Sequence, residues 1–385
     1  MAPRALHPPI FVDTPQQLER MLNDLKGNEA VAIDCEMDAF YSYSSKVCLI
    51  QVGDGATEWI VDPLAVDVLP MGDLFSDPSV RKLLHDAEYD VRQLKADYGF
   101  TFQGIFDTRA ACAVLGVQAP GLASQLEQHF GVQSTGKKKY QRADWTRRPI
   151  PEGQLAYAQL DVAYLHPLAE LLEEEIHTKG RMPVLMTEHT RLQALEASED
   201  PYTDDSWARI KRAAKLDPQA RRRLRQLYLA RNAAAKAANL APFRVMGDTA
   251  LVNIAERPPN NLKEMTRLDG ITWKTARRMG DALLQALEDA RSMDPIKRMP
   301  RRRSGPYLDE AAQDRYDALR SWRASTSRKE EMDSSLILRR ELMEQIAADS
   351  PSNHEELERY LAPWQIERYA DAMMRALEKA GSSGS

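Results

Sequence analysis

The chain has 385 residues, of which 43% are hydrophobic and 28% are charged, and its formal net charge at pH 7 is −5. This composition is typical of a folded protein with two or three domains and excludes a chain that is disordered throughout. No stretch of 18 residues is free of charge and the first ten residues hold three prolines and no apolar run, so neither a membrane-spanning helix nor a secretory signal is predicted.

The first half of the chain alternates short β-branched runs with helical patterns. Strands are predicted at residues 31–34, 47–52, 58–61 and 82–85. Helices are predicted at residues 15–25, 88–98, 107–115, 122–130 and 152–177. Strands mixed with helices favour an α/β domain with a central sheet, and we assign it to residues 1–195.

The second half of the chain shows helical patterns and no convincing strand. The helices are expected at residues 217–239, 249–256, 273–290, 310–324, 334–348, 353–359 and 363–379. Asp217 followed by Pro218 predicts a helix N-cap with proline in the first turn. We expect two all-α domains at 203–292 and 309–380, a basic linker at 293–308 and a flexible tail at 381–385.

Charge is distributed unevenly between these parts. Residues 199–292 contain 18 Lys and Arg against 12 Asp and Glu, whereas residues 309–380 are net acidic. A basic module beside an acidic one suits a nuclease, in which carboxylates bind metal and cations bind phosphate. A solvated helical surface without a partner explains the same charge equally well. For the acidic module, packing or shape is the expected role.

Two carboxylates, Asp34 and Glu36, end the first predicted strand. Side chains alternate between the faces of a strand, so these two acids share one face and Cys35 takes the other. Neighbouring acids at the end of an apolar strand are costly unless a cation lies between them, and Mg²⁺ or Mn²⁺ would satisfy both. Most such pairs in proteins are surface acids, so the pair alone is a weak signal.

Two further motifs supply acids. Asp90 lies in the first turn of the helix predicted at 88–98, close to the competing acids Asp86 and Glu88, and helix capping is the better explanation for at least two of these three carboxylates. Tyr157 and Asp161 stand four residues apart on a predicted helix and therefore project from one face. Taken singly, a surface Tyr–Asp pair is the favoured reading of the second motif.

The order of the three motifs along the chain resembles the DEDDy exonucleases, relatives of proofreading domains on a ribonuclease H-like sheet. The segments 38–43, 46–51, 106–108 and 140–149 resemble the ribonuclease D subgroup, and the resemblance covers roughly residues 10–195. Residues 206–290 resemble an HRDC module, and residues 309–380 resemble a second, more divergent copy. The implied fold is an α/β ribonuclease H-like exonuclease domain, with a mixed central sheet and flanking helices, followed by two all-α HRDC-like domains.

The resemblance also implies a chemistry for the five residues. Asp34, Glu36 and Asp161 would hold one divalent metal ion, Mg²⁺ or Mn²⁺, while Asp34 bridges to a second that Asp90 supports. Tyr157 would orient the attacking water. The implied activity is a 3′→5′ exoribonuclease that releases nucleoside 5′-monophosphates from single-stranded RNA 3′ ends and from structured precursors such as tRNA. We expect a cytoplasmic protein, because the three scattered cysteines suit reduced thiols and no membrane segment is predicted. A monomer is expected as well.

Candidate substrate contacts combine cations with aromatic rings, the mixture that binds single strands. One set precedes the third motif: Lys138, Lys139, Arg142, Trp145 and Arg148. The other comprises Phe40, Tyr41 and His85, for which core packing or a structural role is the alternative. Two other functions stay open: a DNA exonuclease with the same site, since metal ligands do not discriminate sugars, and a non-catalytic RNA-binding protein.

Overall fold

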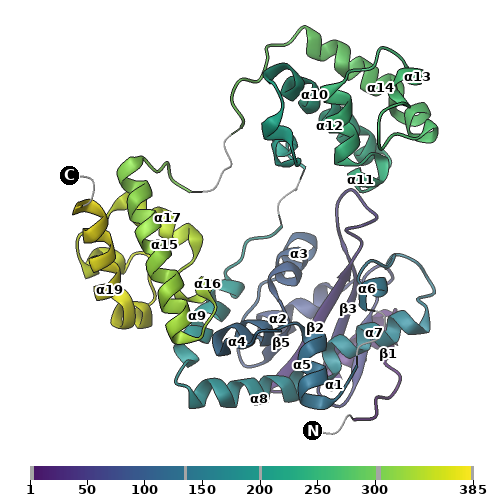
Figure 1. Cartoon of the computed structure of the whole chain (residues 1–385). Helices are drawn as coiled ribbons and strands as arrows, with labels where there is room; N and C mark the ends of the chain where they lie inside the picture. Colours follow the sequence, from purple (N-terminus) through teal and green to yellow (C-terminus); the bar gives the residue numbers. More distant parts are fainter. Residues whose placement is uncertain (1–3, 134–136, 199–201, 301–304, 383–385) are drawn as a thin grey trace.

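The computed structural model describes residues 4–133, 137–198, 202–300 and 305–382. An α/β domain comes first along the chain, and two helical modules follow it (Figure 1). This is the predicted fold class. None of the helices in the described ranges is long and apolar enough to cross a membrane.

The α/β domain is built on a six-stranded mixed sheet. Its strands are β1 (Ile10–Val12), β2 (Ala30–Met37), β3 (Val47–Gly53), β4 (Glu58–Val61), β5 (Arg81–Leu84) and β6 (Ile105–Asp107). They lie in the order β1-β4-β3-β2-β5-β6, and β3 is antiparallel to both of its neighbours while the other pairs are parallel. The four predicted strands are present. The sequence did not predict β1 and β6, which have three residues each.

The helices of this domain cover both faces of the sheet. They are α1 (Pro15–Asp24), α2 (Gly72–Ser76), α3 (Glu88–Tyr98), α4 (Thr108–Leu115), α5 (Leu122–Phe130), α6 (Lys137–Tyr140), α7 (Glu152–Ala163), α8 (Leu165–Thr178) and α9 (Met182–Gln193). The single helix predicted at 152–177 was wrong, because it breaks at Tyr164, whose φ of −115° and ψ of 6° leave the helical region. The break lets α7 pack on β2, β3 and β4 while α8 packs along α4.

Two hydrophobic cores flank β2, as strand alternation requires. Ile33 and Cys35 belong to the core formed with α1, α2 and α3, whereas Ala32 belongs to the core beneath α7 and α8. Asp34 and Glu36 therefore face α7. A bulge in the pairing with β3 follows Glu36 and ends the regular register.

The first helical module contains the short 3₁₀ helices η2 (Ser206–Arg209) and η3 (Ala213–Lys215), and the helices α10 (Pro218–Ala237), α11 (Pro242–Val245), α12 (Asp248–Glu256), α13 (Leu262–Met265) and α14 (Trp273–Arg291). The N-cap prediction is confirmed, since the side chain of Asp217 accepts hydrogen bonds from the backbone of Gln219 and Ala220. Figure 1 shows the loop between β2 and β3 reaching toward α11, and the Ala241 backbone N–H donates to the Tyr41 carbonyl over 3.1 Å.

The second helical module contains α15 (Glu310–Glu330), α16 (Ser334–Ile337), α17 (Arg340–Asp349), α18 (His354–Leu357) and α19 (Pro363–Ser382). The helix predicted at 334–348 is broken by the extended backbone of Leu338. The tail predicted at 381–385 was wrong for its first two residues, because α19 continues to Ser382, and residues 383–385 lie outside the described ranges. Of the predicted linker, residues 301–304 lie outside the described ranges. Leu319 and Met373 of this module share one core with Leu168 of α8.

Candidate active site

Three carboxylates converge where α7 crosses β2. Oxygen atoms of Asp34, Glu36 and Asp161 all lie within 4.8 Å of one another, and each side chain is partly exposed. Two come from alternate positions of one strand, and the third comes from the helix packed on that face. Such a group of oxygen ligands has the hard donor chemistry that Mg²⁺ and Mn²⁺ prefer.

The electrostatics of this group favour a cation. Burial raises the pKa of Asp34 to about 7, and burial followed by the charge of Asp34 raises the pKa of Glu36 well above its usual range. Among the described residues, neither Asp34 nor Glu36 forms an ion pair with Lys, Arg or His. The three carboxylates are thus gathered closely enough to share one cation, and the residues fit a divalent ion.

Asp90 lies beside this group without being part of the close cluster. It occupies the first turn of α3 and is only 8% exposed. Burial first, and then the charge of Asp34, raises the pKa of Asp90 well above its usual range. Asp107 holds the start of α3 in place. Its carboxylate accepts hydrogen bonds from the backbone N–H groups of Asp86 and Ala87 over 3.1 and 2.9 Å. The sequence alone did not indicate this role of Asp107.

Tyr157 adds a neutral hydroxyl to the site. Burial, and then the charge of Asp161, raises the pKa of Tyr157 far above neutrality, so the phenol keeps its proton and hydrogen-bonds to Asp161. Its ring is fixed by neighbouring aromatic rings, with centroids 5.6 Å from Tyr140 and 6.4 Å from Trp145. The i, i+4 spacing thus brings the tyrosine and the aspartate together as expected.

Two of the predicted substrate contacts are structural instead. Trp145 is 1% exposed and packs with Tyr157 and Leu49 in a buried cluster, so its ring is closed to a nucleobase. Arg148 forms an ion pair with Asp62, to whose two carboxylate oxygens it donates over 2.5 and 2.7 Å. The same guanidinium donates to the Cys48 carbonyl over 3.0 Å and so ties the loop to β3.

Tyr41 is held by the first helical module. The Arg244 guanidinium lies 3.9 Å from the centre of its ring, and the Tyr41 hydroxyl donates to the Arg142 carbonyl over 3.0 Å. Arg244 Nε also donates to the Phe40 carbonyl over 2.6 Å. Tyr41 therefore joins α11 to the loop ahead of α7, whereas Phe40 is 43% exposed and meets Phe243 edge-on at 6.4 Å.

The remaining predicted contacts differ in their surroundings. His85 Nδ1 lies 2.9 Å from the hydroxyl oxygen of Thr108, which indicates a structural bond for this nitrogen. Lys139 and Arg142 are exposed and are compatible with phosphate contact. The side chain of Lys138 lies outside the described residues.

Gln51 was missed as a site residue. It lies on β3 directly opposite Asp34, and it is fully buried. The available signal was a polar residue inside an apolar strand. Arg244 had no local signal, because its role depends on contact between segments about 200 residues apart.

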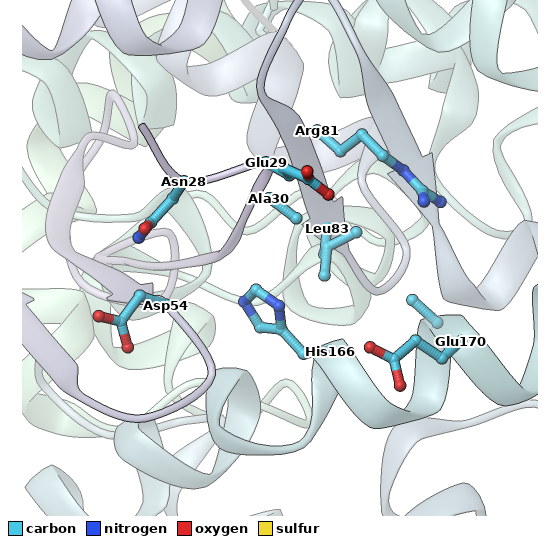
Figure 2. A pocket seen from close by; sticks show the side chains of 9 residues that line it. Asn28, Glu29, Ala30, Asp54, Arg81, Leu83, His166 and Glu170 are labelled. Atoms are coloured by element: carbon cyan, nitrogen blue, oxygen red, sulfur yellow. The ribbon is translucent and has the colours of Figure 1, made fainter. Parts of the chain in front are cut away.

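The α/β domain also contains a pocket (Figure 2). It is lined by Asn28, Glu29, Ala30, Asp54, Arg81, Leu83, His166, Ala169 and Glu170. These residues come from the beginnings of β2 and β5, from the turn after β3 and from α8, and they include none of the five predicted catalytic residues. His166 Nε2 lies 3.1 Å from the Gly53 carbonyl, so one ring nitrogen already has a backbone partner.

Family models match most of the chain. A 3′-5′ exonuclease model matches residues 9–177, and an HRDC domain model matches residues 220–287 and 312–377. The first match contains the β2, α3 and α7 motifs. The two HRDC matches fall on the two helical modules, as the sequence resemblance indicated.

Curated proteins named ribonuclease D match most of this chain. Ribonuclease D of Haemophilus influenzae is 31% identical over 296 residues, which span 74% of this chain and 72% of that protein. Ribonuclease D of Pseudomonas paraeruginosa is 29% identical over 359 residues, 91% of this chain and 92% of that protein. The exosome complex exonuclease RRP6 of Saccharomyces cerevisiae is 27% identical over 298 residues, and the match spans only 40% of its length.

Among solved structures, Escherichia coli RNase D, described as an exoribonuclease involved in structured RNA processing, superposes with a TM-score of 0.70 at 26% identity. The match covers 96% of this chain and 99% of that one.

Proposed function

The chain belongs to the ribonuclease D family of 3′→5′ exoribonucleases, and we propose that it shortens RNA from the 3′ end at the carboxylate site between β2 and α7. The observation that carries this proposal is the convergence of Asp34, Glu36 and Asp161, whose carboxylate oxygens lie within 4.8 Å of one another. The reaction is hydrolysis of the terminal phosphodiester, and the product is a nucleoside 5′-monophosphate.

The proposed cofactors are two divalent metal ions, Mg²⁺ or Mn²⁺. Asp34, Glu36 and Asp161 would hold one ion, and Asp34 together with Asp90 would hold the other. Bound metal ions of this kind supply an activated water and stabilise the leaving 3′-oxygen. The high pKa of Asp34 and Glu36 in the metal-free protein means that ion binding releases protons, so metal affinity should fall as the pH falls.

Tyr157 is proposed to orient the attacking water. Its phenol keeps its proton at neutral pH, because burial and the charge of Asp161 raise its pKa. A group that holds its proton this firmly is a poor general base, so positioning through a hydrogen bond is the role that fits. The packed rings of Tyr140 and Trp145 restrict its rotation.

The proposed substrate is single-stranded RNA at the 3′ ends of structured precursors such as tRNA. Exposed cations at Lys139, Arg142 and Arg147 lie just ahead of α7, where they can meet phosphates. Exposed Phe40 offers a ring for a nucleobase. The basic first module can extend this contact. We propose that the enzyme acts as a monomer in the cytoplasm.

The test is a time course on 5′-labelled single-stranded RNA and on matched DNA, each with Mg²⁺, Mn²⁺ or EDTA. Stepwise shortening of RNA that requires metal and is lost in Asp34→Asn supports the proposal. Glu19→Gln, which removes an exposed carboxylate from α1, serves as the matched control and should cleave like the wild type. Equal shortening of DNA would withdraw the RNA preference, and RNA binding without shortening under either metal would refute the enzyme.

A further inference from the structure

Gln51 of β3 is a buried amide without a hydrogen-bond partner. Its side chain has no exposed surface, and neither Oε1 nor Nε2 bonds to any residue in the described ranges. Buried side-chain amides are usually hydrogen-bonded, because an unpaired polar group loses its bonds to water without replacement. The position therefore costs stability, which calls for a functional reason.

The sheet register places this amide against the carboxylate site. Gln51 pairs directly with Asp34 on one side and with Ile60 on the other. Directly opposed residues have Cβ atoms about 4.5–5.5 Å apart and share one face of the sheet. Ile60 packs beneath α7 with Tyr157, so the amide lies on the face of the sheet that carries the carboxylates.

We propose that Gln51 is a positioning residue for the metal-loaded site. Its Nε2–H donates to the ionised carboxylate of Asp34 and fixes the orientation in which Asp34 binds a divalent ion. The proposal rests on the proposed function. Groups that hydrogen-bond to metal ligands orient those ligands and raise metal affinity.

The residue type suits this role. An amide donates a hydrogen bond without carrying charge, so it can hold Asp34 without competing with the metal ion. Lysine at this position would neutralise the carboxylate, and glutamate would add to the negative charge already gathered there. Leucine or methionine would fill the space but leave the carboxylate free to turn.

The experiment compares wild-type protein with Gln51→Met, which keeps a linear side chain of similar size. Melting temperatures are measured in EDTA and over a Mn²⁺ titration, and kcat and KM are measured on 5′-labelled RNA. Gln125→Met is the matched control, because Gln125 is also fully buried but lies on α5 and donates to the Ala119 carbonyl over 2.9 Å. The control should lose stability and keep its Mn²⁺ affinity.

For Gln51→Met we expect an unchanged or higher melting temperature in EDTA, because an unpaired polar group is removed. Its Mn²⁺ affinity and kcat should fall by about 10- to 100-fold, while KM for RNA changes little. Wild-type Mn²⁺ affinity and kcat in the variant would overturn the proposal. Gln51→Leu repeats the test with a different shape, and failure of both variants to fold would show that the amide serves packing. A wild-type protein that binds Mn²⁺ but cleaves nothing would refute the proposed function and leave the Mn²⁺ comparison for Gln51 intact.

Discussion

Replacing Asp34 by asparagine should stabilise the metal-free protein while it abolishes nuclease activity. Asp34 contributes charge to a group that also contains Glu36 and Asp161, and the carboxylate oxygens of the three residues lie within 4.8 Å of one another. Asparagine has nearly the same shape and carries no charge. It therefore removes the electrostatic cost of the empty site together with the ligand that the proposed metal ions require.

The size of this effect follows from the pKa of Asp34. The value is about 7 in the folded protein, against about 3.9 for an unfolded chain. Between these values the folded state binds a proton that the unfolded state has lost, so stability falls as the pH rises from about 4 to about 7. A difference of this size corresponds to about 4 kcal/mol. Because the side chain is partly exposed, solvent screening reduces the expected penalty at pH 8 to about 1–3 kcal/mol.

The assay is thermal unfolding of the wild type and Asp34→Asn in EDTA at pH 8 and pH 4.5. At pH 8 the variant should melt higher by about 2–4 °C for each kcal/mol recovered, and at pH 4.5 the two proteins should melt nearly together. Mn²⁺ at about 100 times its dissociation constant should stabilise the wild type by about 2.7 kcal/mol and the variant by much less. Glu19→Gln, on the exposed face of α1, should match the wild type throughout.

A lower melting temperature for Asp34→Asn at pH 8 in EDTA would refute this reasoning, because the carboxylate would then have a stabilising partner. An equal gain at both pH values would also count against it, since the cause would then be packing rather than ionisation. Retention of the full Mn²⁺ shift would exclude Asp34 as a metal ligand.

Three further predictions concern Tyr157, His189 and Arg244. Tyr157→Phe removes the hydroxyl bonded to Asp161 but keeps the ring, so kcat should fall about 10²-fold with little change in melting temperature. Burial lowers the pKa of His189 to about 4. The buried neutral imidazole therefore adds up to about 3 kcal/mol to the free energy of unfolding above pH 6.5, and this stability is lost as the pH falls through 4. His189→Gln should make the free energy of unfolding depend less on pH between these values. Arg244→Ala removes the cation over the Tyr41 ring and should lower kcat/KM about 10-fold.

Two of these predictions have a matched control variant. For His189→Gln the control is His177→Gln, which removes an exposed histidine from α8 and should leave the acid limb of the curve unchanged. For Arg244→Ala the control is Arg277→Ala, which removes an exposed cation from the same module. An equal fall in kcat/KM in both variants would show that Arg244 acts only through its charge and not through its contact with Tyr41. A wild-type kcat in Tyr157→Phe would contradict the proposal that the phenol orients the attacking water.

Local pattern was sufficient for the part of the site that depends on short spacing. Asp34 and Glu36 share a face because strand side chains alternate, and Tyr157 meets Asp161 because they stand one helical turn apart. Both relations hold wherever the elements pack. The contact between β2 and α7, by contrast, was expected only from the family resemblance, because local sequence patterns do not indicate which helix packs on which strand.

The failures occur where tertiary contact decides the role of a side chain. Cations beside aromatic rings predicted RNA contact at Trp145 and Arg148, but one is buried under α7 and the other pairs with Asp62. The same mixture of residues builds a stiff loop or a binding surface, depending on which side chains turn inward. Similarly, the end of α7 at Tyr164 follows from packing against two different elements, and the apolar pattern of 152–177 does not reveal it.

The two helical modules are attached to the exonuclease domain in different ways, and this difference divides their roles. The second module is part of the domain's core: Arg181 donates to backbone carbonyls of Val114, Glu330 and Glu331, and a Cβ at Gly116 would lie 2.1 Å from the Glu331 carbonyl oxygen. An acidic module held in this way can serve packing without meeting RNA, as its charge indicated. The described contacts of the first module gather instead on the loop that follows Glu36. Changes in the second module should therefore act through stability, whereas changes in the first should reach kcat/KM directly.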